Sequence, residues 1–445
     1  MIVGTTLWDA AVRILRENDL GGWTKPAPRL YPHQWSWDSA FVAIGLARID
    51  PDRALRELET LFAAQWADGR VPHIVYNPAV APEAYFPDGA RWACAELSVT
   101  PPRAPATSGL IQPPVHALGA LAVADAAAER GTLDDLSPRL RTLFPKLVAW
   151  HRYLATARDP DGTGLVTIYH PWESGTDNSP RWDAALANVV VGAVPPYIRR
   201  DLQHVADPSH RPTDAEYDRY LWLVESLKAA RYDDARVHAT HPFLIRDVLF
   251  SAIFAAAGRS LADLAGRLGE SAGVADVLAW SERSSAAVQG AWDADEQLAL
   301  DYDVRAGRPV LVRTWSGLAP LILPRLDRRL ADRVVRRTFG PDFVGADGLA
   351  YAVVPSTVPG SPGFDPRSYW RGPTWPIANW LLWRGLRQHG YPTEADGLRA
   401  AGLAQLDRPE ARFAEYFEPF TAEPLGSLNQ SWTAAVALDW LAELI

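Results

Sequence analysis

Residues 50–67, DPDRALRELETLFAAQWA, place an apolar side chain on the same side of the chain every three or four positions. This spacing matches one face of an α-helix. Asp50 can cap the helix, and Pro51 suits its first turn because the backbone N–H that proline lacks would be unpaired there. A second apolar stretch, 37–48, ends just before it. We therefore expect these two helices to pack side by side as a pair.

The same helical period recurs throughout the rest of the chain. Thr213 or Asp214 can cap a later helix, and Pro373 is expected in the first turn of another. Strand signals are short and few, at 73–76, 165–169 and 300–304. The full set of expected helices covers 6–17, 37–48, 51–67, 113–130, 137–157, 213–231, 244–268, 274–292, 310–323, 328–338, 373–388, 393–406 and 431–444.

The loops between these helices are very unequal in length. Long aromatic and polar stretches occupy 68–112, 158–212 and 339–372, whereas other connections are only a few residues long. A toroid of inner and outer helices, with long loops at one end only, fits this pattern. The sequence therefore predicts an all-α fold with its functional site at the loop-rich mouth. No flexible linker divides the chain, so we expect one domain spanning 1–445, with 158–212 as an inserted loop or cap.

Charge excludes several kinds of partner. The chain has 445 residues, a formal net charge of −9 and only three lysines, Lys25, Lys146 and Lys228. A surface for nucleic acid or an anionic membrane needs clustered basic side chains, because contacts to phosphates supply most of the affinity. We expect neither partner. The charged N-terminal stretch 1–20 lacks a signal-peptide layout, so the cytoplasm is the expected compartment.

Motifs for cofactor and metal chemistry are missing from the sequence. It contains no phosphate-binding glycine loop, no H-E-x-x-H zinc pattern and no G-x-S-x-G nucleophile elbow. The ten histidines are scattered, and the single cysteine, Cys94, can form neither an intrachain disulfide nor a thiolate cluster. We expect no metal and no cofactor, and we interpret Cys94 as a small buried hydrophobe.

Aromatic residues provide the first positive signal, since the chain has 19 tryptophans. Most large aromatics fill cores, but their rings also stack on the C–H faces of sugars while the indole N–H binds a hydroxyl. Several of these tryptophans lie in loops that also carry carboxylates. One such loop is HPWESGTDNSPRWD, 170–183, which sets Glu173 and Asp177 between two tryptophans.

A carboxyl beside an indole loses part of its hydration, which raises its pKa and suits a glycosidic general acid. Glu173 and Asp177 are both candidates for this acid. The structural alternative is that Asp177 caps the turn through 178–180 and Glu173 pairs with Arg181.

A second aromatic and acidic segment is FAEYFEPF, 413–420. Glu415 and Glu418 are both candidates for a base there, and a strand-like edge with surface acids is the alternative. Two further loops, YPHQWSWDSAF at 31–41 and YWRGPTWP at 369–376, also lead into helices. Asp38 in the first of these is either a helix N-cap or a ligand for paired sugar hydroxyls. Convergence of four such loops at one mouth favours a sugar site.

These segments, together with RPTDAEYDRYLWL and AEYFEPFTAEPLGSLNQSWTAA, resemble glycoside hydrolase family 63, within it the bacterial glucosylglycerate/mannosylglycerate hydrolase branch. The resemblance extends from about residue 18 to residue 440. It implies an (α/α)6 barrel and hydrolysis with inversion of the α-glycosidic bond of a sugar–glycerate, without a cofactor. It assigns the acid to Asp177 and the base to Glu415.

The resemblance also implies a set of substrate contacts. Arg211, Tyr217 and Gln430 match positions that hold the glycerate, for which a guanidinium is well suited. Phe417 and Ala422 depart from the family pattern but leave both acids in place. The expected sugar contacts are Tyr31, Trp35, Trp37, Asp38, Tyr85, Gln112, Trp172, Gly175, Tyr369, Trp370 and Trp375.

Two other functions are compatible with the same residues. An oligosaccharide α-glucosidase or trehalase-like hydrolase would use the same barrel, but a neutral aglycone gives Arg211 no carboxylate to bind. A non-catalytic sugar-binding protein would not need both Asp177 and Glu415. The residues do not separate a glucosyl from a mannosyl substrate, and they leave open whether the chain forms a homo-oligomer.

Overall fold

Helices that are buried all round alternate along the chain with helices that are buried on one face only. The computed structural model describes residues 3–199 and 213–444. Every residue of α2 and of the 3₁₀ helix η6 is buried, as is nearly all of α16. The buried, inner elements are α2 (Ser36–Ala47), α6 (His116–Glu129), α11 (Val248–Leu268), η6 (Trp315–Ile322), α14 (Pro376–Gln388) and α16 (Ser431–Ala442). The outer elements are α1 (Val3–Glu17), α3 (Pro51–Ala63), α7 (Leu133–Ala157), α12 (Val274–Gly290), α13 (Arg328–Thr338) and α15 (Pro392–Leu406).

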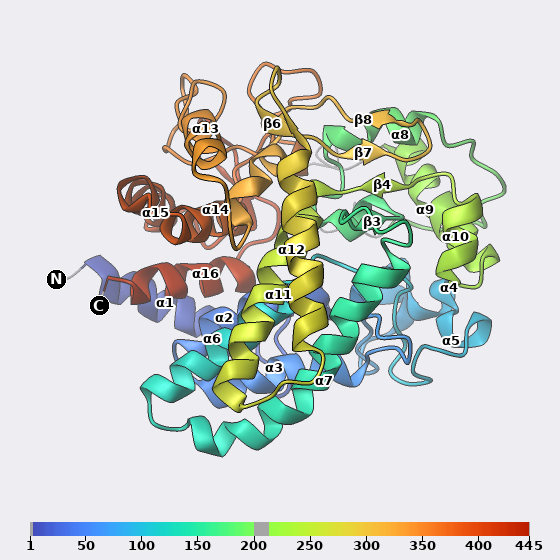
Figure 1. Ribbon diagram of the computed structural model, residues 1–445, viewed down its shortest axis with the longest axis horizontal. Coiled ribbons are helices and arrows are strands. Elements are labelled where there is room, and N and C mark those ends of the chain that lie inside the picture. Colours follow the sequence, from blue (N-terminus) through green and yellow to red (C-terminus); the bar gives the residue numbers. More distant parts are fainter. Residues whose placement is uncertain (1–2, 200–212, 445) are drawn as a thin grey trace.

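The six inner elements close into a ring (Figure 1). They pack on one another in the order α2, α6, α11, η6, α14 and α16, and α16 packs back on α2. Each outer helix covers this ring. For example, α3 packs on α2 and α6, and α15 packs on α14 and α16. Because α1 also packs on α16, the two ends of the chain lie side by side. This arrangement is the expected (α/α)6 barrel.

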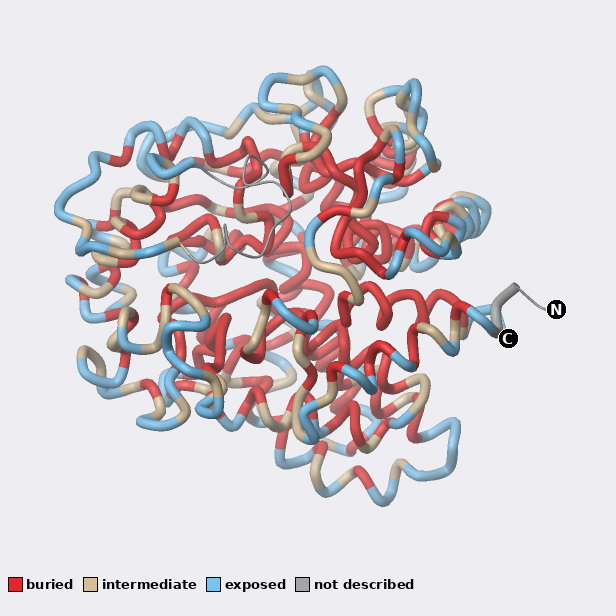
Figure 2. The backbone as a smooth tube through the Cα atoms, turned by 180° about the vertical axis from the view of Figure 1, so that it is seen from behind, coloured by how far each residue is buried: buried red, intermediate tan, exposed pale blue. Residues whose placement is uncertain are grey.

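The connections between elements differ sharply at the two ends of the barrel. Each inner element before α16, the last one, leads to the next outer one through three to five residues, as at 48–50 and 269–273. Each outer element returns to an inner one through a much longer segment. The long segments are 18–35, 64–115, 158–247, 291–314, 339–375 and 407–430. All inner elements therefore begin at the same, loop-covered end, which confirms the expected loop-rich mouth. Figure 2 shows the exposed backbone concentrated in the peripheral loops and the buried backbone in the middle.

Short strands and helices stiffen the long loops. Small antiparallel pairs are formed by β1 (Gln34–Trp35) with β2 (Ile74–Val75), by β5 (Trp292–Asp293) with β6 (Leu298–Ala299), and by β9 (Tyr416–Phe417) with β10 (Pro424–Leu425). A four-stranded sheet has the order β3 (Thr167–Ile168), β4 (Ile245–Arg246), β7 (Tyr302–Asp303) and β8 (Arg308–Pro309). The loop helices are η1 (Pro82–Ala84), α4 (Gly89–Trp92), α5 (Cys94–Leu97), η2 (Pro171–Ser174), η3 (Pro180–Trp182), α8 (Asp183–Ala187), α9 (Asp214–Ala229), α10 (Asp234–Thr240) and η7 (Tyr369–Arg371).

Two of the expected caps are confirmed. The Asp50 carboxylate accepts a hydrogen bond from the Arg53 backbone N–H at 3.0 Å, with Pro51 in the first turn of α3. Of the two candidates for α9, Thr213 is the cap, and its side chain forms a reciprocal capping box with Glu216.

Several predicted helix starts are wrong by three or more residues; the one expected at 137, for example, lies at Leu133. Three others have a local cause. The helix expected from residue 373 begins at Pro376, which fills the first-turn position instead of Pro373. The helix expected from residue 244 begins at Val248, because Asp247 caps it and residues 245–246 belong to β4. The helix expected over 310–323 is the 3₁₀ helix η6. Its Pro320 lacks the N–H that an α-helix would use at that position.

The helix α11 alone, among the described residues, is long and apolar enough to cross a membrane by length and composition. Most of this apolar stretch is buried inside the barrel, where α11 is one of the six inner elements. A core helix is therefore its role in this fold.

Candidate active site

A pocket opens at the loop-covered end of the barrel, where the inner elements begin. Its empty volume is about 1160 Å³, counting the open mouth. The first turns of α2 and α16 contribute side chains to it, and the long loops supply the rest. Most of the residues expected from the sequence line this one pocket: Tyr31, Trp35, Trp37, Asp38, Tyr85, Gln112, Trp172, Gly175, Asp177, Tyr217, Tyr369, Glu415 and Gln430.

Three expected contacts are not among the described residues that line the pocket. Arg211 lies outside the described residues. Trp370 and Trp375 were expected to face the sugar, but both are fully buried behind Tyr369 and stack on each other with ring centroids 3.8 Å apart. The Trp375 indole N–H donates to the Tyr369 backbone carbonyl at 3.2 Å. Tyr369 has a left-handed backbone (φ 42°), and it alone of the three side chains lines the pocket.

Sequence reasoning missed several lining residues. Asn178 follows Asp177, Trp432 lies within the quoted SLNQSW stretch, and Tyr220 follows Tyr217 by three residues on α9, so each had a local signal. The others, mainly from the irregular segment 73–92, had none. The full set of missed residues is Leu30, His73, Ile74, Ala84, Phe86, Pro87, Trp92, Asn178, Tyr220 and Trp432.

Glu415 lies immediately before β9 and is held by donors on both carboxylate oxygens. Its Oε1 accepts hydrogen bonds from the hydroxyls of Tyr31 (2.8 Å) and Tyr369 (3.0 Å). Its Oε2 accepts from the backbone N–H of Ser427 at 2.9 Å, and the Ser427 hydroxyl, which donates to Gln430 at 2.6 Å, lies 3.1 Å away. The side chain is almost fully buried in the pocket wall. This set of donors stabilises a negatively charged carboxylate in a fixed orientation.

The turn before Ser427 requires a glycine. Gly426 has φ +71°, and a Cβ at this position would lie 2.6 Å from Glu415 Oε2. Only a residue without a side chain lets the backbone come this close to the carboxylate.

Glu418, the other candidate in this segment, points elsewhere. Its Oε2 accepts hydrogen bonds from the backbone N–H groups of Phe420 (2.8 Å) and Thr421 (2.5 Å) and from the Thr421 hydroxyl (2.7 Å). It therefore closes the turn that follows β9 and does not line the pocket.

Asp177 lies in the loop between η2 and η3 and lines the pocket opposite several aromatic rings. The loop is tightly fitted on both sides of it. A Cβ on Gly175 would lie 2.4 Å from the Trp37 ring, and the Asn178 side-chain carbonyl accepts from the Trp370 backbone N–H at 2.8 Å. The neighbours of Asp177 are thus fixed to two other walls of the pocket.

Glu173 is committed to a buried ion pair, and the structural alternative in which it pairs with Arg181 is wrong. Both of its oxygens accept hydrogen bonds from the Arg158 guanidinium at 2.7 Å. The carboxylate also accepts from the backbone N–H groups of Tyr169 (2.7 Å) and Ile111 (3.2 Å), and Glu173 is fully buried. Arg181 instead donates to Asp301 at 2.6 Å. Glu173 therefore lies in a buried ion pair outside the pocket lining, unlike Asp177.

Asp38 is not a helix N-cap. The helix α2 begins at Ser36 after Trp35, so Asp38 lies in its first turn and lines the pocket. Burial, together with the charges of Glu415 and Asp177, raises the pKa of Asp38 well above its usual range. The three carboxyl groups therefore interact electrostatically across one pocket. A protonated Asp38 can both donate and accept hydrogen bonds, which suits a ligand for sugar hydroxyls.

The other titratable groups near the pocket are not suited to acid–base work near neutral pH. Burial lowers the pKa of His73 to about 3 and that of His33 to about 4. Burial also raises the pKa of the Cys94 thiol to about 12, in agreement with its interpretation as a buried hydrophobe. Within 3–199 and 213–444, no group of three or more His, Cys, Asp and Glu residues is arranged to hold a metal ion.

Comparison with known proteins gives consistent relationships over almost the whole chain. A model of the mannosylglycerate hydrolase MGH1-like glycoside hydrolase domain matches residues 31–433. The chain is 47% identical to a glucosylglycerate hydrolase of Mycolicibacterium hassiacum, with 98% of each sequence covered. It is 42% identical to a mannosylglycerate hydrolase of Rubrobacter radiotolerans, covering 97% of this chain and 96% of that one.

Solved structures agree. The crystal structure of a family 63 mannosylglycerate hydrolase from Thermus thermophilus, in complex with Tris and D-glycerate, matches with a TM-score of 0.89. It is 40% identical, and the match covers 98% of this chain and 99% of that one. A neutral trehalase from Saccharomyces cerevisiae matches with a TM-score of 0.57 at 16% identity, covering 94% of this chain and 73% of that one, which shows a shared fold only. The chain belongs to the mannosylglycerate hydrolase MGH1-like glycoside hydrolases, within family 63.

Proposed function

We propose that this protein hydrolyses the α-glycosidic bond of glucosylglycerate, of mannosylglycerate or of both with inversion, using Asp177 as general acid and Glu415 as general base. One observation carries the proposal: Asp177 and Glu415, far apart in sequence, line one aromatic pocket and both act electrostatically on Asp38. The two nearby alternatives, Glu173 and Glu418, do not line the pocket and are held by other partners.

The two carboxyl groups divide the reaction between them. Asp177 donates a proton to the glycosidic oxygen as the bond to the anomeric carbon breaks, and glycerate leaves as the free alcohol. Glu415 takes a proton from a water molecule that attacks the anomeric carbon from the opposite face. The hydroxyls of Tyr31 and Tyr369 and the Ser427 N–H hold Glu415 in place for this step. The sugar is released with inverted configuration.

The walls of the pocket supply the sugar subsite. Aromatic rings can stack on the C–H faces of the sugar, and Asp38 and Gln112 can bind its hydroxyls. Gln112 is itself oriented by the Trp37 backbone N–H, which donates to its side-chain oxygen at 3.2 Å. Trp370 and Trp375 support Tyr369 from behind. The proposed sugar contacts are Tyr31, Trp35, Trp37, Asp38, Tyr85, Gln112, Trp172, Gly175 and Tyr369.

The proposed glycerate contacts are Arg211, Tyr217 and Gln430. Tyr217 and Gln430 line the pocket. Gln430 accepts a hydrogen bond from Ser427 through its side-chain oxygen at 2.6 Å, while its amide nitrogen is buried without a protein partner among the described residues. A buried N–H group without a partner is costly, so a polar substrate group is a suitable acceptor. The relatives named for these two substrates, and the D-glycerate in the Thermus thermophilus complex, support glycerate as the leaving group.

Product analysis on both sugar–glycerates tests the proposal. Purified protein is incubated with glucosylglycerate and, separately, mannosylglycerate, and the anomer first released is followed by NMR. We expect free sugar of inverted configuration from at least one of them, and little turnover of trehalose or of a glucoside with a neutral aglycone. Retained configuration would reject Glu415 as a base acting through water. Preferential turnover of trehalose or an α-glucan would reject the glycerate subsite.

A further inference from the structure

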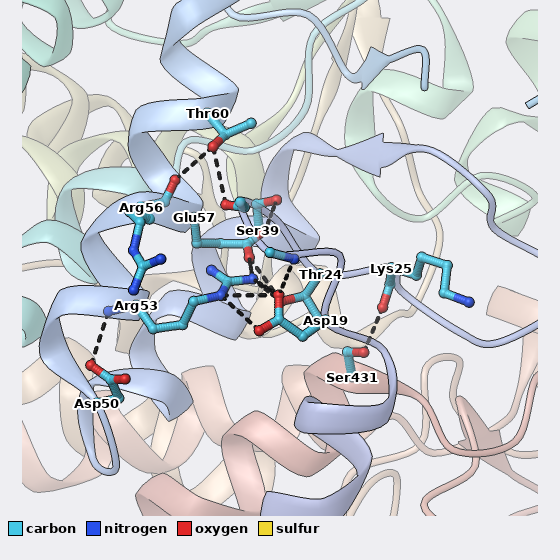
Figure 3. Close-up of polar contacts among 12 residues, drawn as sticks. Asp19, Thr24, Lys25, Ser39, Asp50, Arg53, Arg56, Glu57, Thr60 and Ser431 are labelled. Atoms are coloured by element: carbon cyan, nitrogen blue, oxygen red, sulfur yellow. Dashed lines mark hydrogen bonds and ion pairs between the residues drawn. The ribbon is translucent and has the colours of Figure 1, made fainter. Parts of the chain in front are cut away.

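A buried polar cluster lies between α3, the first turn of α2 and the segment 18–35 (Figure 3). Its centre is Glu57 on α3, whose side chain is fully buried and does not line the pocket. Burial raises the pKa of Glu57, and the neighbouring Arg53 guanidinium acts in the opposite direction. A buried carboxyl held by several donors is normally there to fix the groups that contact it.

One oxygen of Glu57 holds the beginning of the segment. Glu57 Oε2 accepts hydrogen bonds from the Thr24 hydroxyl at 2.8 Å and from Arg53 Nη2 at 3.0 Å. Arg53 also donates to Asp19 at 2.8 Å and to the Thr24 hydroxyl at 2.9 Å. Residues 19–24 are therefore attached to α3 through Glu57 and Arg53 together.

The other oxygen holds the start of α2 through Ser39, and it holds the end of the segment through Ser39 and a longer contact of 3.4 Å from the Gln34 amide. Glu57 Oε1 accepts from the Ser39 hydroxyl at 2.7 Å, and Ser39 follows the pocket residue Asp38. The Gln34 side-chain amide donates to the Glu57 backbone carbonyl at 3.1 Å and to the Ser39 hydroxyl at 3.0 Å. Gln34 precedes the pocket residue Trp35.

Between these two anchors the chain reaches the catalytic side of the pocket. Ser431, the first residue of α16, donates through its backbone N–H to the Pro26 carbonyl and through its hydroxyl to the Lys25 carbonyl, at 2.7 and 2.6 Å. Tyr31 follows, and its hydroxyl donates to Glu415 Oε1 at 2.8 Å. Glu57 thus contacts both ends of the segment whose middle provides a hydrogen bond to the proposed base.

We propose that Glu57 is a positioning residue for the hydrolysis: by tying Thr24 and Gln34 to α3 it keeps the Tyr31 hydroxyl on Glu415. The role of Glu415 in this inference rests on the proposed function. Glu57→Gln removes the charge and reverses one donor–acceptor pair at the anchor, while Arg53 keeps its bond to Asp19. The variant should therefore fold, with the 24–34 segment displaced.

A double-mutant cycle with Tyr31→Phe tests the link. Loss of a hydrogen bond to a charged group corresponds to roughly ten- to hundredfold in rate, so each single variant should lower kcat by about that factor. If Glu57 acts through Tyr31, the double variant should be hardly slower than the worse single variant. Losses that multiply in full would overturn the proposal, as would a lowered Tm with kcat unchanged.

A control and a milder variant keep the test decisive. Glu59 lies on the same helix, but its carboxylate pairs with Arg139 on α7 and does not contact the cluster around Glu57. In Glu59→Gln, kcat should therefore stay within about twofold of wild type. If Glu57→Gln fails to fold, Thr24→Val removes one donor and leaves the Arg53 pair in place. Thr24→Val should lower kcat by a smaller factor than Glu57→Gln. The double variant with Tyr31→Phe should again be hardly slower than the worse single variant.

A crystal structure of Glu57→Gln separates this inference from the proposed function, because it does not depend on turnover. The distance from the Tyr31 hydroxyl to Glu415 should exceed hydrogen-bond range. An unchanged contact would refute the positioning role even in an active enzyme. Failure of the wild-type protein to cleave either sugar–glycerate would refute the proposed function and leave the structural result standing.

Discussion

The segments that carry Asp177 and Glu415 each contain a second carboxyl three or four residues away, and the fold restrains it differently in each. In the acid segment, Glu173 is locked by Arg158, which comes from the end of α7. In the base segment, Glu418 is held by the N–H groups and hydroxyl of its own turn. The segment of the proposed acid is thus held through a long-range buried ion pair, and that of the proposed base through local hydrogen bonds and two tyrosines.

This difference predicts where each segment is vulnerable. Removing one partner of a buried ion pair leaves an uncompensated charge and costs about 3–5 kcal/mol. Removing the acceptor of a local turn costs about 1–2 kcal/mol, because water can replace part of the lost bonding. The acid segment should therefore depend on distant residues, and the base segment mainly on its immediate neighbours.

The largest effects should come from the two residues that face the pocket. Asp177→Asn and Glu415→Gln should each lower kcat on a sugar–glycerate by about 10²- to 10⁴-fold, the usual contribution of general acid–base catalysis. Circular dichroism and Tm should show that both variants fold.

An activated substrate should then separate the two roles. A 2,4-dinitrophenyl glycoside needs little protonation of its leaving group, so Asp177→Asn should recover much of its rate on it, whereas Glu415→Gln should not. Near-normal turnover of the natural substrate by Asp177→Asn would mean that another group is the acid. Equal rescue of both variants would remove the distinction between acid and base.

The next effect tests the two restrained carboxyls directly. Glu173→Gln should lower the free energy of unfolding by about 3–5 kcal/mol and reduce kcat, because Arg158 loses its partner and the Asp177 loop its anchor. Glu418→Gln should lower the free energy of unfolding by about 1–2 kcal/mol and leave kcat within a few-fold of wild type. Urea unfolding and steady-state kinetics measure both. Equal destabilisation would contradict the contrast between long-range and local restraint.

The same contrast explains which features were predictable from sequence. The hairpin at 37–67 and the cap at Asp50 depend on neighbouring residues, so periodicity was sufficient to find them. The choice between Glu173 and Asp177 depends on Arg158 and Ile111, which reach Glu173 only in the folded chain. The residues alone therefore left that choice open, and the family resemblance was needed to name the acid.

The sequence of a motif also did not predict which of its side chains line the pocket. In YWRGPTWP all three aromatics were expected to line the pocket, but a left-handed backbone at Tyr369 turns the chain so that Trp370 and Trp375 stack behind it. Aspartate is a common residue at helix N-caps, but α2 begins two residues before Asp38. Asp38 therefore lies in the first turn of the helix and lines the pocket. Both outcomes depend on backbone conformation that residue type does not reveal.

The last expected effect, a gain in stability that depends on pH, concerns a carboxyl behind the acid segment. Arg181, three residues beyond Asn178, lies 2.6 Å from Asp301 and 3.6 Å from Asp247. Burial raises the pKa of Asp247 to about 6, with Arg181 opposing and Asp301 adding to the shift. Its Oδ1 still caps α11 by accepting from the Phe250 N–H at 2.9 Å, an interaction that asparagine can reproduce.

The sign of the pH dependence follows from the raised pKa. Between about pH 4 and pH 6 the folded state holds a proton on Asp247 that the unfolded chain releases, so this group's contribution to stability falls as pH rises through that window. Asp247→Asn should therefore match wild type near pH 4 and gain stability above pH 6, by at most about 3 kcal/mol. Asp301→Asn breaks the shorter contact to Arg181 and should destabilise at neutral pH. If Asp247→Asn were instead less stable than wild type at pH 7 and equal to it at pH 4, the ionised carboxylate would be a favourable partner of Arg181. Arg181 would then form two stabilising ion pairs where we assign it one, with Asp301.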